Sequence, residues 1–196
     1  MRQEPEQPLL CPACQDKTHA FARARSFAWY ENAVVRAILL LKFEQIEPPG
    51  SWFADRLAEM VDAKGDAMAA DVVVPVPLHR ERERQRGYNP AAQLSKPLAK
   101  RLRLPCKAVL PVRTRAHPDK QVLSLEEPWG SVRGAFATRP GSQVDNLRVL
   151  LVDNVLTTGA TLDACARAQR DGGAKSAIGL TVARAIRNPL PSTREW

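Results

Sequence analysis

The segment whose residue types and spacing could do chemistry is residues 149–161, Val-Leu-Leu-Val-Asp-Asn-Val-Leu-Thr-Thr-Gly-Ala-Thr. An apolar run ends at Asp153, and three threonines with one glycine follow before a helical pattern begins. Small residues let backbone N–H groups converge, threonine hydroxyls add donors, and a helix N-terminus favours an anion. The pattern predicts a cradle for a phosphate monoester, with the carboxylate of Asp153 placed to bind sugar hydroxyls.

Two other nucleotide-binding motifs would compete with this interpretation, and the chain contains neither of them. It has no G-x-x-x-x-G-K-[ST], which excludes a nucleoside triphosphatase of the Walker type, and no G-x-G-x-x-G, which excludes the dinucleotide-binding fingerprint. The remaining alternative is a plain strand, turn and helix with a threonine cap. A plain turn needs no acid followed by three threonines, so the phosphate cradle is favoured.

Alternating strand and helix patterns must position this segment. Apolar runs predict strands over residues 71–76, 107–112, 147–152 and 176–183. Helical patterns follow two of them, over residues 90–102, where Asn89-Pro90 opens the helix, and over 161–171, where Gly172-Gly173 ends it. Pro97 should kink the first of these helices. This order predicts an open, mostly parallel α/β sheet flanked by helices, with ligands at the carboxyl ends of the strands.

The first fifty residues differ in texture from the rest. Residues 33–43 predict an amphipathic helix, Pro48-Pro49-Gly50 predicts its stop, and Ser51 predicts the N-cap of a second helix. Nearer the start, Cys11-Pro-Ala-Cys14 supplies half of the four ligands that a structural zinc site needs. We therefore divide the chain into an N-terminal segment, 1–50, with a partial zinc ribbon and a hood helix, and an α/β domain, 51–196.

Charge and composition narrow the class of protein. The 196 residues include 29 Lys and Arg against 21 Asp and Glu, which gives a net charge of +8 and a pI near 9.7. This surplus suits a phosphorylated small molecule or a nucleic acid, although it also serves as a solubilising surface charge. No apolar run is long enough to insert in a membrane, and the first residues lack the apolar stretch of a secretory signal, so a cytoplasmic protein is expected.

Basic residues outside the phosphate cradle could bind single-stranded DNA. Arginines alternate with Glu and Gln over residues 80–86, and residues 96–103 place further basic side chains on one predicted helix. Such a face could follow a phosphate backbone, and a self-paired, solvated run of charges is the alternative. Few aromatic residues accompany it, so a base-stacking platform is weakly supported there.

Residues 150–161 are similar to the motif that binds phosphoribosyl pyrophosphate (PRPP) in type I phosphoribosyltransferases. Other segments resemble the ComF family of competence-associated proteins within that superfamily. They are the leading Cys-x2-Cys, Leu41-Lys-Phe, Val74-Pro-Val-Pro-Leu-His-Arg, Arg86-Gly-Tyr-Asn-Pro-Ala-Ala-Gln-Leu, Arg113-Thr-Arg with Gln121 downstream, and Val132-Arg-Gly-Ala-Phe136. The resemblance covers nearly the whole chain in the family's order, and it implies a type I phosphoribosyltransferase-like fold.

The resemblance also implies site residues. Asp153 and Asn154 would stand at the catalytic acid positions, with Asp153 on the ribose hydroxyls. The phosphate-binding residues would be Val155, Leu156, Thr157, Thr158, Gly159, Ala160 and Thr161, with the hydroxyl of Thr158 facing the phosphate. The pyrophosphate loop would comprise Pro75, Val76, Pro77, Leu78 and His79, with Arg86 beside it. The flexible loop that closes over the reaction centre would carry Arg113, Arg115, Lys120 and Arg133.

By the same resemblance the protein would bind PRPP or a related sugar phosphate with Mg²⁺ and serve in DNA uptake during natural transformation. Its partners would be single-stranded DNA and the uptake machinery, and the sequence leaves a homodimer open. ComF-like proteins commonly begin with a four-cysteine ribbon, so Cys11 and Cys14 look like a remnant whose first knuckle is missing, for instance through a downstream start. His19 could supply a third zinc ligand.

Three positions depart from the family pattern. Asn154 replaces the second acid, Pro128 stands where an Arg is usual, and Ser131 stands where an Asn is usual. Asn154 keeps a hydrogen-bond acceptor but removes a charge beside the cationic reaction centre, so binding of hydroxyls survives better than catalysis. Two functions therefore stay open. One is an active phosphoribosyltransferase of nucleotide metabolism or salvage with an unidentified nucleophile. The other is a non-catalytic nucleic-acid-handling or regulatory module that keeps the nucleotide fold.

Overall fold

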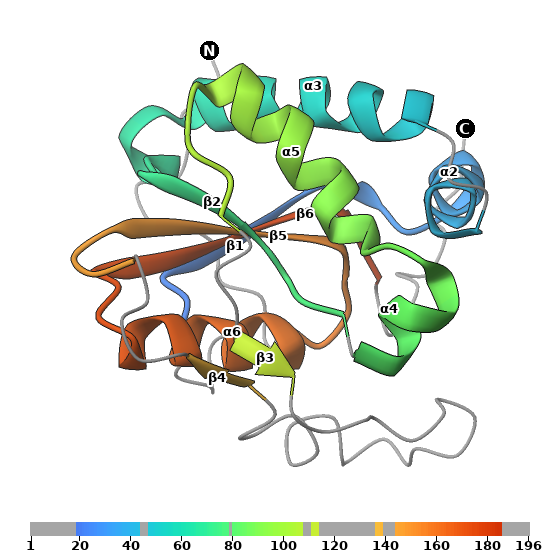
Figure 1. The fold of residues 1–196 in the computed structure, drawn as a ribbon. Coiled ribbons are helices and arrows are strands. Elements are labelled where there is room, and N and C mark those ends of the chain that lie inside the picture. Colours follow the sequence, from blue (N-terminus) through green and yellow to red (C-terminus); the bar gives the residue numbers. More distant parts are fainter. Residues whose placement is uncertain are drawn as a thin grey trace.

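A four-stranded parallel sheet forms the centre of the computed structural model, which describes residues 19–43, 47–78, 80–107, 111–113, 136–138 and 144–185 (Figure 1). The strand order is β1 (Arg23–Trp29), β6 (Ser176–Arg184), β5 (Arg148–Leu156) and β2 (Val72–Pro75). Every neighbouring pair is parallel, so the carboxyl ends of all four strands meet at one edge of the sheet. The predicted parallel α/β sheet is confirmed.

Helices cover both faces of this sheet (Figure 1). On one side lie α2 (Asn32–Phe43), α3 (Glu47–Lys64) and α5 (Pro90–Leu102), and on the other lies α6 (Ala160–Asp171). The short elements are η1 (Gly65–Met68), α4 (Arg80–Arg86) and an antiparallel pair, β3 (Pro111–Arg113) with β4 (Phe136–Thr138), beside α6. None of the helices in the described ranges is both long and apolar enough to cross a membrane.

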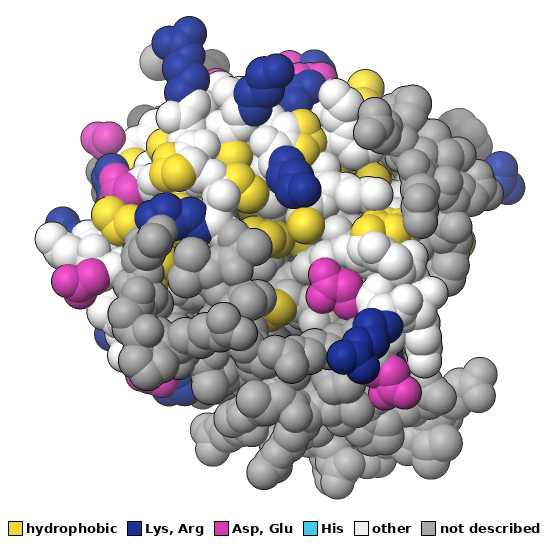
Figure 2. All heavy atoms as spheres, in the orientation of Figure 1, with side chains coloured by type: hydrophobic (Ala, Val, Ile, Leu, Met, Phe, Trp, Pro, Cys, Tyr) yellow, Lys and Arg dark blue, Asp and Glu magenta, His cyan; other side chains and the backbone are white. Residues whose placement is uncertain are grey.

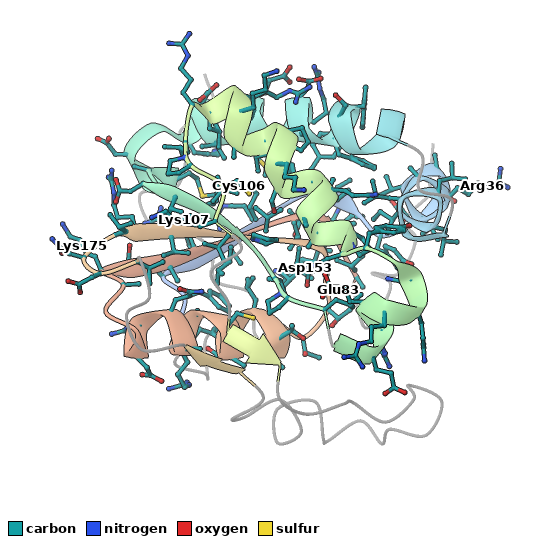
Figure 3. All side chains as sticks on the ribbon, viewed as in Figure 1. Arg36, Glu83, Cys106, Lys107, Asp153 and Lys175 are labelled. Carbon is teal, nitrogen blue, oxygen red and sulfur yellow. The ribbon has the colours of Figure 1, made fainter. Side chains whose placement is uncertain are left out.

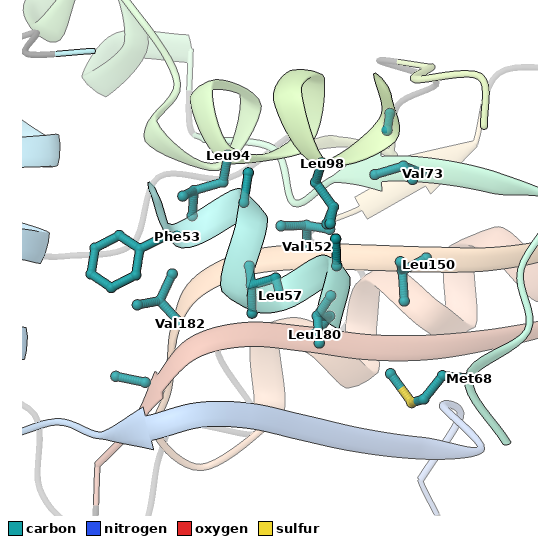
Figure 4. Packing of buried hydrophobic residues seen from close by; sticks show 14 of the residues in the cluster. Phe53, Leu57, Met68, Val73, Leu94, Leu98, Leu150, Val152, Leu180 and Val182 are labelled. Atoms are coloured by element: carbon teal, nitrogen blue, oxygen red, sulfur yellow. The ribbon is translucent and has the colours of Figure 1, made fainter. Parts of the chain in front are cut away.

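The sheet separates two hydrophobic clusters. Successive side chains of β5 point to opposite faces of the sheet, and both sets of side chains are apolar. Leu150 and Val152 pack toward α3 and α5, whereas Val149 and Leu151 pack toward α6. Figure 4 shows the first cluster, in which side chains of the two helices meet those of the sheet. The residues labelled there are Phe53, Leu57, Met68, Val73, Leu94, Leu98, Leu150, Val152, Leu180 and Val182. The site at the end of β5 therefore stands on a strand that is rigidly packed on both faces.

Two predicted boundaries were wrong. The strand expected over 147–152 continues to Leu156, because Val155 and Leu156 keep pairing with β6. The helix expected from Ser51 begins at Glu47, and Pro48 and Pro49 lie inside its first turn instead of stopping a helix. Proline is tolerated in a first turn because the N–H groups it lacks have no partner there in any helix.

The edges of the sheet also differ from the prediction. Of the strand expected over 107–112, Lys107 donates its N–H to the carbonyl of Val73 in β2 at 3.0 Å, beside an isolated parallel bridge of Cys106 with Val73. Residues 108–110 lie outside the described residues, and β3 pairs with β4 instead of the parallel sheet. The opposite edge is β1, which the sequence did not indicate. Because β1 pairs with β6, residues within the predicted N-terminal segment, 1–50, belong to the same sheet as the later residues.

An ion pair fastens the amino ends of β2 and β5, opposite the candidate site. The Arg148 guanidinium donates to both carboxylate oxygens of Asp71, at 2.7 and 3.1 Å, and its backbone N–H donates to Oδ2 at 2.7 Å. Hydrogen bonds from the Arg148 side chain and backbone lower the pKa of Asp71 from 3.8 to about 2.

We expect Asp71→Asn to lower the free energy of unfolding at neutral pH by about 1 kcal/mol, since both side chains are partly exposed to screening solvent. The folded pKa lies below the unfolded one, so this contribution is complete above pH 3.8 and disappears as the pH falls through about 2. Urea unfolding at several pH values should show the loss at neutral pH and convergence of the variant with the parent in acid. Asp62→Asn on the exposed face of α3 is the control, and an equal loss there would contradict the assignment.

Candidate functional site

The end of β5, the following turn and the start of α6 line one hollow that opens to solvent. Six of the predicted residues line it: Asp153, Val155, Leu156, Thr157, Gly159 and Thr161. Two residues that the sequence did not single out also line it, Leu162 of α6 and Thr181 of β6. Asp153 and the small residues of the turn thus share one hollow, although Asp153 lies four residues before the turn begins.

Asp153 lies where β5 approaches its end, and Figure 3 shows its side chain there. Its Oδ1 accepts a hydrogen bond from the backbone N–H of Asn154 at 2.7 Å, which fixes the orientation of the carboxylate. Thr181 is its neighbour across the β5–β6 ladder and is buried, with its hydroxyl 2.6 Å from that of Ser26 on β1. The carboxylate is therefore held in place at the wall of the hollow while remaining partly exposed.

The turn after β5 depends on Gly159. Its φ of +82° lies in the left-handed region, which other residues rarely adopt, and it stands at the N-cap of α6. Thr157 is exposed and Thr161 is half-buried, and both face the hollow. This geometry brings hydroxyls and the amino end of a twelve-residue helix to the same place.

The hydroxyl of Thr158, predicted to face a phosphate, takes part in a local hydrogen bond and keeps its own O–H as a donor, so that role stays a prediction. Its Oγ1 accepts a hydrogen bond from the N–H of Ala160 at 3.3 Å, and Thr158 is not among the residues that line the hollow. This bond from a threonine oxygen to the N–H two residues on is a common local turn. The threonines of the turn that line the hollow are Thr157 and Thr161.

Asn154 also lies apart from the hollow. It is 6% exposed, and its side-chain Oδ1 has no hydrogen-bond partner among the described residues. Adjacent residues of a strand point to opposite faces, so Asp153 and Asn154 do not present their side chains to the same ligand. The structure brings the first residue of the predicted acid pair to the hollow and leaves the second buried.

The predicted pyrophosphate loop follows β2 along the same edge of the sheet. Val76 donates its N–H to the carbonyl of Val152 at 2.8 Å, and its own carbonyl accepts from the Asn89 side chain at 3.0 Å. Asn89 also caps α5, where its Oδ1 accepts from the N–H of Ala91 at 3.0 Å. Pro75, Val76 and Pro77 are buried and Leu78 is half-buried. Asn89 thus holds this loop as well as capping α5. The Asn-Pro pair in the sequence indicated only the start of the helix.

Several predicted site residues cannot be compared with the structure. His79, Arg115, Lys120 and Arg133 lie outside the described residues, as do Cys11 and Cys14. For Arg113 only the backbone is described, in β3, and Arg86 ends α4. Among the described residues no group of three His, Cys, Asp or Glu side chains could hold a metal ion.

The segment before β1 packs on the outer side of the turn, which sequence reasoning missed. Asp163 in the first turn of α6 is buried and accepts the N–H of Ala20 at 2.6 Å. His19, which the sequence offered as a third zinc ligand, lies 3.6 Å from the Asp163 carboxylate and stacks on Phe21. The Phe21 ring lies 3.7 Å from where a Cβ of Gly159 would be. These contacts hold residues 19–21 against the start of α6.

Sequence comparison finds relatives with competence and DNA-utilization names, whereas no family model matches the chain. The chain is 32% identical over 104 residues to Competence protein F of Haemophilus influenzae, covering 53% of this chain and 45% of that protein. It is 29% identical over 157 residues to DNA utilization protein YhgH of Escherichia coli K12, covering 79% and 68%. It is 31% identical over 107 residues to Competence protein ComFC of Bacillus subtilis, covering 55% and 41%. The chain thus spans less than half the length of two of these relatives.

Comparison with solved structures finds a PRPP amidotransferase and phosphoribosyltransferases. A glutamine PRPP amidotransferase from Bacillus subtilis has a TM-score of 0.46 and 20% identity, covering 72% of this chain and 28% of that one. A purine phosphoribosyltransferase from Pyrococcus horikoshii has a TM-score of 0.38 and 20% identity, covering 74% and 95%. The sequence matches to Competence protein F, ComFC and YhgH confirm the predicted resemblance of this chain to the ComF competence proteins.

Proposed function

We propose that the hollow at the end of β5 binds a phosphorylated ribose, PRPP or a related sugar phosphate, in a protein that serves in the handling of DNA taken up by the cell. The observation that carries the first part is the convergence of Asp153, Thr157 and Thr161 on one hollow at the amino end of α6. The names of the relatives, Competence protein F and DNA utilization protein YhgH, support the second part.

The chemistry of the hollow fits the two ends of such a ligand. Backbone N–H groups at the start of a helix and two threonine hydroxyls are donors, which suits a phosphate monoester. A carboxylate is an acceptor, which suits vicinal sugar hydroxyls. Because Asp153 and the residues of the turn line the same hollow, one ribose 5-phosphate could contact both.

The carboxylate of Asp153, together with the oxygens of a bound phosphate, also suits Mg²⁺. Mg²⁺ usually binds through one or two carboxylates and the oxygens of a substrate phosphate, and Asp153 supplies one such carboxylate. When bound, the ion would neutralise charge on the pyrophosphate. Zinc at Cys11 and Cys14 remains a separate proposal that rests on the sequence alone.

Transfer of the phosphoribosyl group to a nucleophile is not part of this proposal. Stabilisation of positive charge at the reacting sugar carbon is a task for preorganised negative groups, and the second position of the predicted acid pair is an uncharged, buried Asn154. On the face shown in Figure 2, the described Lys and Arg side chains are dispersed among Asp and Glu, so we assign no basic patch for DNA to that face.

Isothermal titration of the full chain with PRPP, with and without Mg²⁺, tests the proposal. We expect saturable binding that Mg²⁺ strengthens, and weaker binding of ribose 5-phosphate, which keeps the monoester and loses the pyrophosphate. Inorganic pyrophosphate is the control for the charge alone. If PRPP gives no saturable heat with Mg²⁺, or binds no better than pyrophosphate, the hollow is not a phosphoribosyl site.

A further inference from the structure

We propose that Asp163 and Phe21 are positioning residues of the turn between β5 and α6, although neither of them lines the hollow. Asp163 holds residues 19–21 against α6, and the ring of Phe21 then supports the turn at Gly159. This inference deepens the proposed function and rests on it, because it concerns the affinity of the same hollow. It is carried by the hydrogen bonds of a buried carboxylate, the packing of one ring and the conformation of one glycine.

Asp163 is a buried carboxylate that bonds to a distant part of the chain. It is 6% exposed, and its Oδ1 accepts the backbone N–H of Ala20, 143 residues away, at 2.6 Å. Its Oδ2 accepts from the Arg167 guanidinium at 3.3 Å. An acid in the first turn of a helix is favourable in solvent as well, whereas a carboxylate is costly to bury unless it is hydrogen-bonded. The buried carboxylate is therefore the attachment point of residues 19–21 on α6.

The attached segment brings an aromatic ring to the turn. Ala20 and Phe21 are each 8% exposed, so the segment is packed into the fold. The Phe21 ring stacks on that of His19, with centroids 4.6 Å apart and planes 12° from parallel. Two atoms of the Phe21 ring, Cζ and Cε1, lie 3.7 and 3.8 Å from where a Cβ of Gly159 would be. The ring therefore packs beside the backbone of Gly159.

Gly159 is the residue at which this support matters. It adopts a φ of +82° at the N-cap of α6, so it sets how the chain passes from the turn into the helix. Its carbonyl accepts the N–H of Asp163 at 2.8 Å, which closes a ring of contacts from Gly159 through Asp163, Ala20 and Phe21 back to Gly159. Glycine has more backbone freedom than any other residue, and these contacts restrict that freedom to one conformation of the turn.

A turn held in one conformation binds an anion more tightly than a turn that must be ordered first, because ordering costs free energy at each binding event. When residues 19–21 are released, the turn is competent to bind for only a fraction of the time, and the apparent affinity falls by that fraction. No contact with the ligand has to be lost. The expected effect is a loss of affinity in a folded protein, which a residue that serves stability alone would not cause.

Calorimetric titration of the full chain with PRPP and Mg²⁺, at a temperature at which thermal melts show every variant to be folded, tests this role. Asp163→Ala removes the acceptor of the Ala20 N–H, and Phe21→Ala removes the ring. We expect each change to lower the affinity about tenfold. Asp163→Asn keeps an oxygen for that N–H, so its affinity should stay within about threefold of the parent. In a chain that carries Phe21→Ala, the further change Asp163→Ala should cost little affinity, because both act through the same contacts.

Two changes farther along α6 are the controls. Asp171→Ala removes an exposed acid at the other end of the helix, and Ala168→Gly loosens the helix at a buried position. We expect both to keep the affinity of the parent, even though Ala168→Gly lowers the melting temperature. An affinity loss in Ala168→Gly equal to that in Asp163→Ala would overturn the proposal. So would unchanged affinity in both Asp163→Ala and Phe21→Ala.

Amide hydrogen exchange of the ligand-free chain separates this proposal from the proposed function. Asp163→Ala and Phe21→Ala should speed the exchange of the amides of residues 157–163, and Asp163→Asn should not. If the parent chain does not bind PRPP while exchange in this stretch rises as expected, the phosphoribosyl proposal fails and the support of the turn by residues 19–21 is retained. Unchanged exchange in both alanine variants would show that residues 19–21 do not hold the turn, whatever the hollow binds.

Discussion

Replacing Asp153 by Asn is expected to weaken PRPP binding in the presence of Mg²⁺ by about 10- to 100-fold. Asp153 offers the one carboxylate among the residues that line the hollow, and a charge-assisted hydrogen bond contributes roughly 1.5–3 kcal/mol. Asn keeps the shape of the side chain and can still accept the N–H of Asn154, so the fold should be retained. Calorimetric titration of the variant and parent, with a thermal melt of each, measures both quantities.

Asn154→Ala is the matched control for this experiment, because it changes the adjacent residue of the same strand. The Asn154 side chain is buried away from the hollow, so we expect PRPP affinity within about threefold of the parent. The melting temperature of this variant reports any cost of removing a buried amide. Equal loss of affinity in the two variants would mean that Asp153 is not the ribose anchor.

The elements around the hollow could be predicted from the sequence because their signals are local. An apolar run of residues followed by small turn residues and a helical pattern specifies β5 and α6, and Gly172-Gly173 ends α6 as predicted. The strand near 176–183 and the helix from Pro90 were predicted for the same reason. Segments buried on both faces of a parallel sheet are apolar throughout, so periodicity and turn residues identify them without tertiary information.

The features that the sequence did not reveal depend on contacts between distant residues. In β1 two arginines and two aromatic residues alternate with alanine and serine, and pairing with β6, more than 150 residues later, places this segment in the sheet. In the sequence, Asp163 is an ordinary acidic residue of a first helical turn. In the fold, its carboxylate accepts the backbone N–H of Ala20. Local pattern gives the type of an element, and long-range packing decides which side chains remain available to a ligand.

Gly179 in β6 has the tightest surroundings of any glycine whose neighbourhood is described. A Cβ built there would lie 2.0 Å from Cδ2 and 3.1 Å from Cγ of Leu162, and 3.3 Å from Cβ of Ala24. Leu162 is 2% exposed, and it belongs both to the core under α6 and to the lining of the hollow. The close approach of α6 to the sheet therefore requires glycine at this position.

Gly179→Ala is expected to lower the free energy of unfolding by about 2–3 kcal/mol, because overpacking a filled core forces side chains or backbone to move. Leu162 must move first, and since it follows the turn directly, PRPP affinity should fall together with stability. Urea unfolding measures the first effect and titration the second. The double variant Gly179→Ala/Leu162→Ala separates this cause from a general intolerance of the strand: removal of the obstructing side chain should make the double variant more stable than the sum of the two single changes predicts. Strict additivity would show that the added methyl group does not act through Leu162, and that the start of α6 is not held to the sheet by this contact.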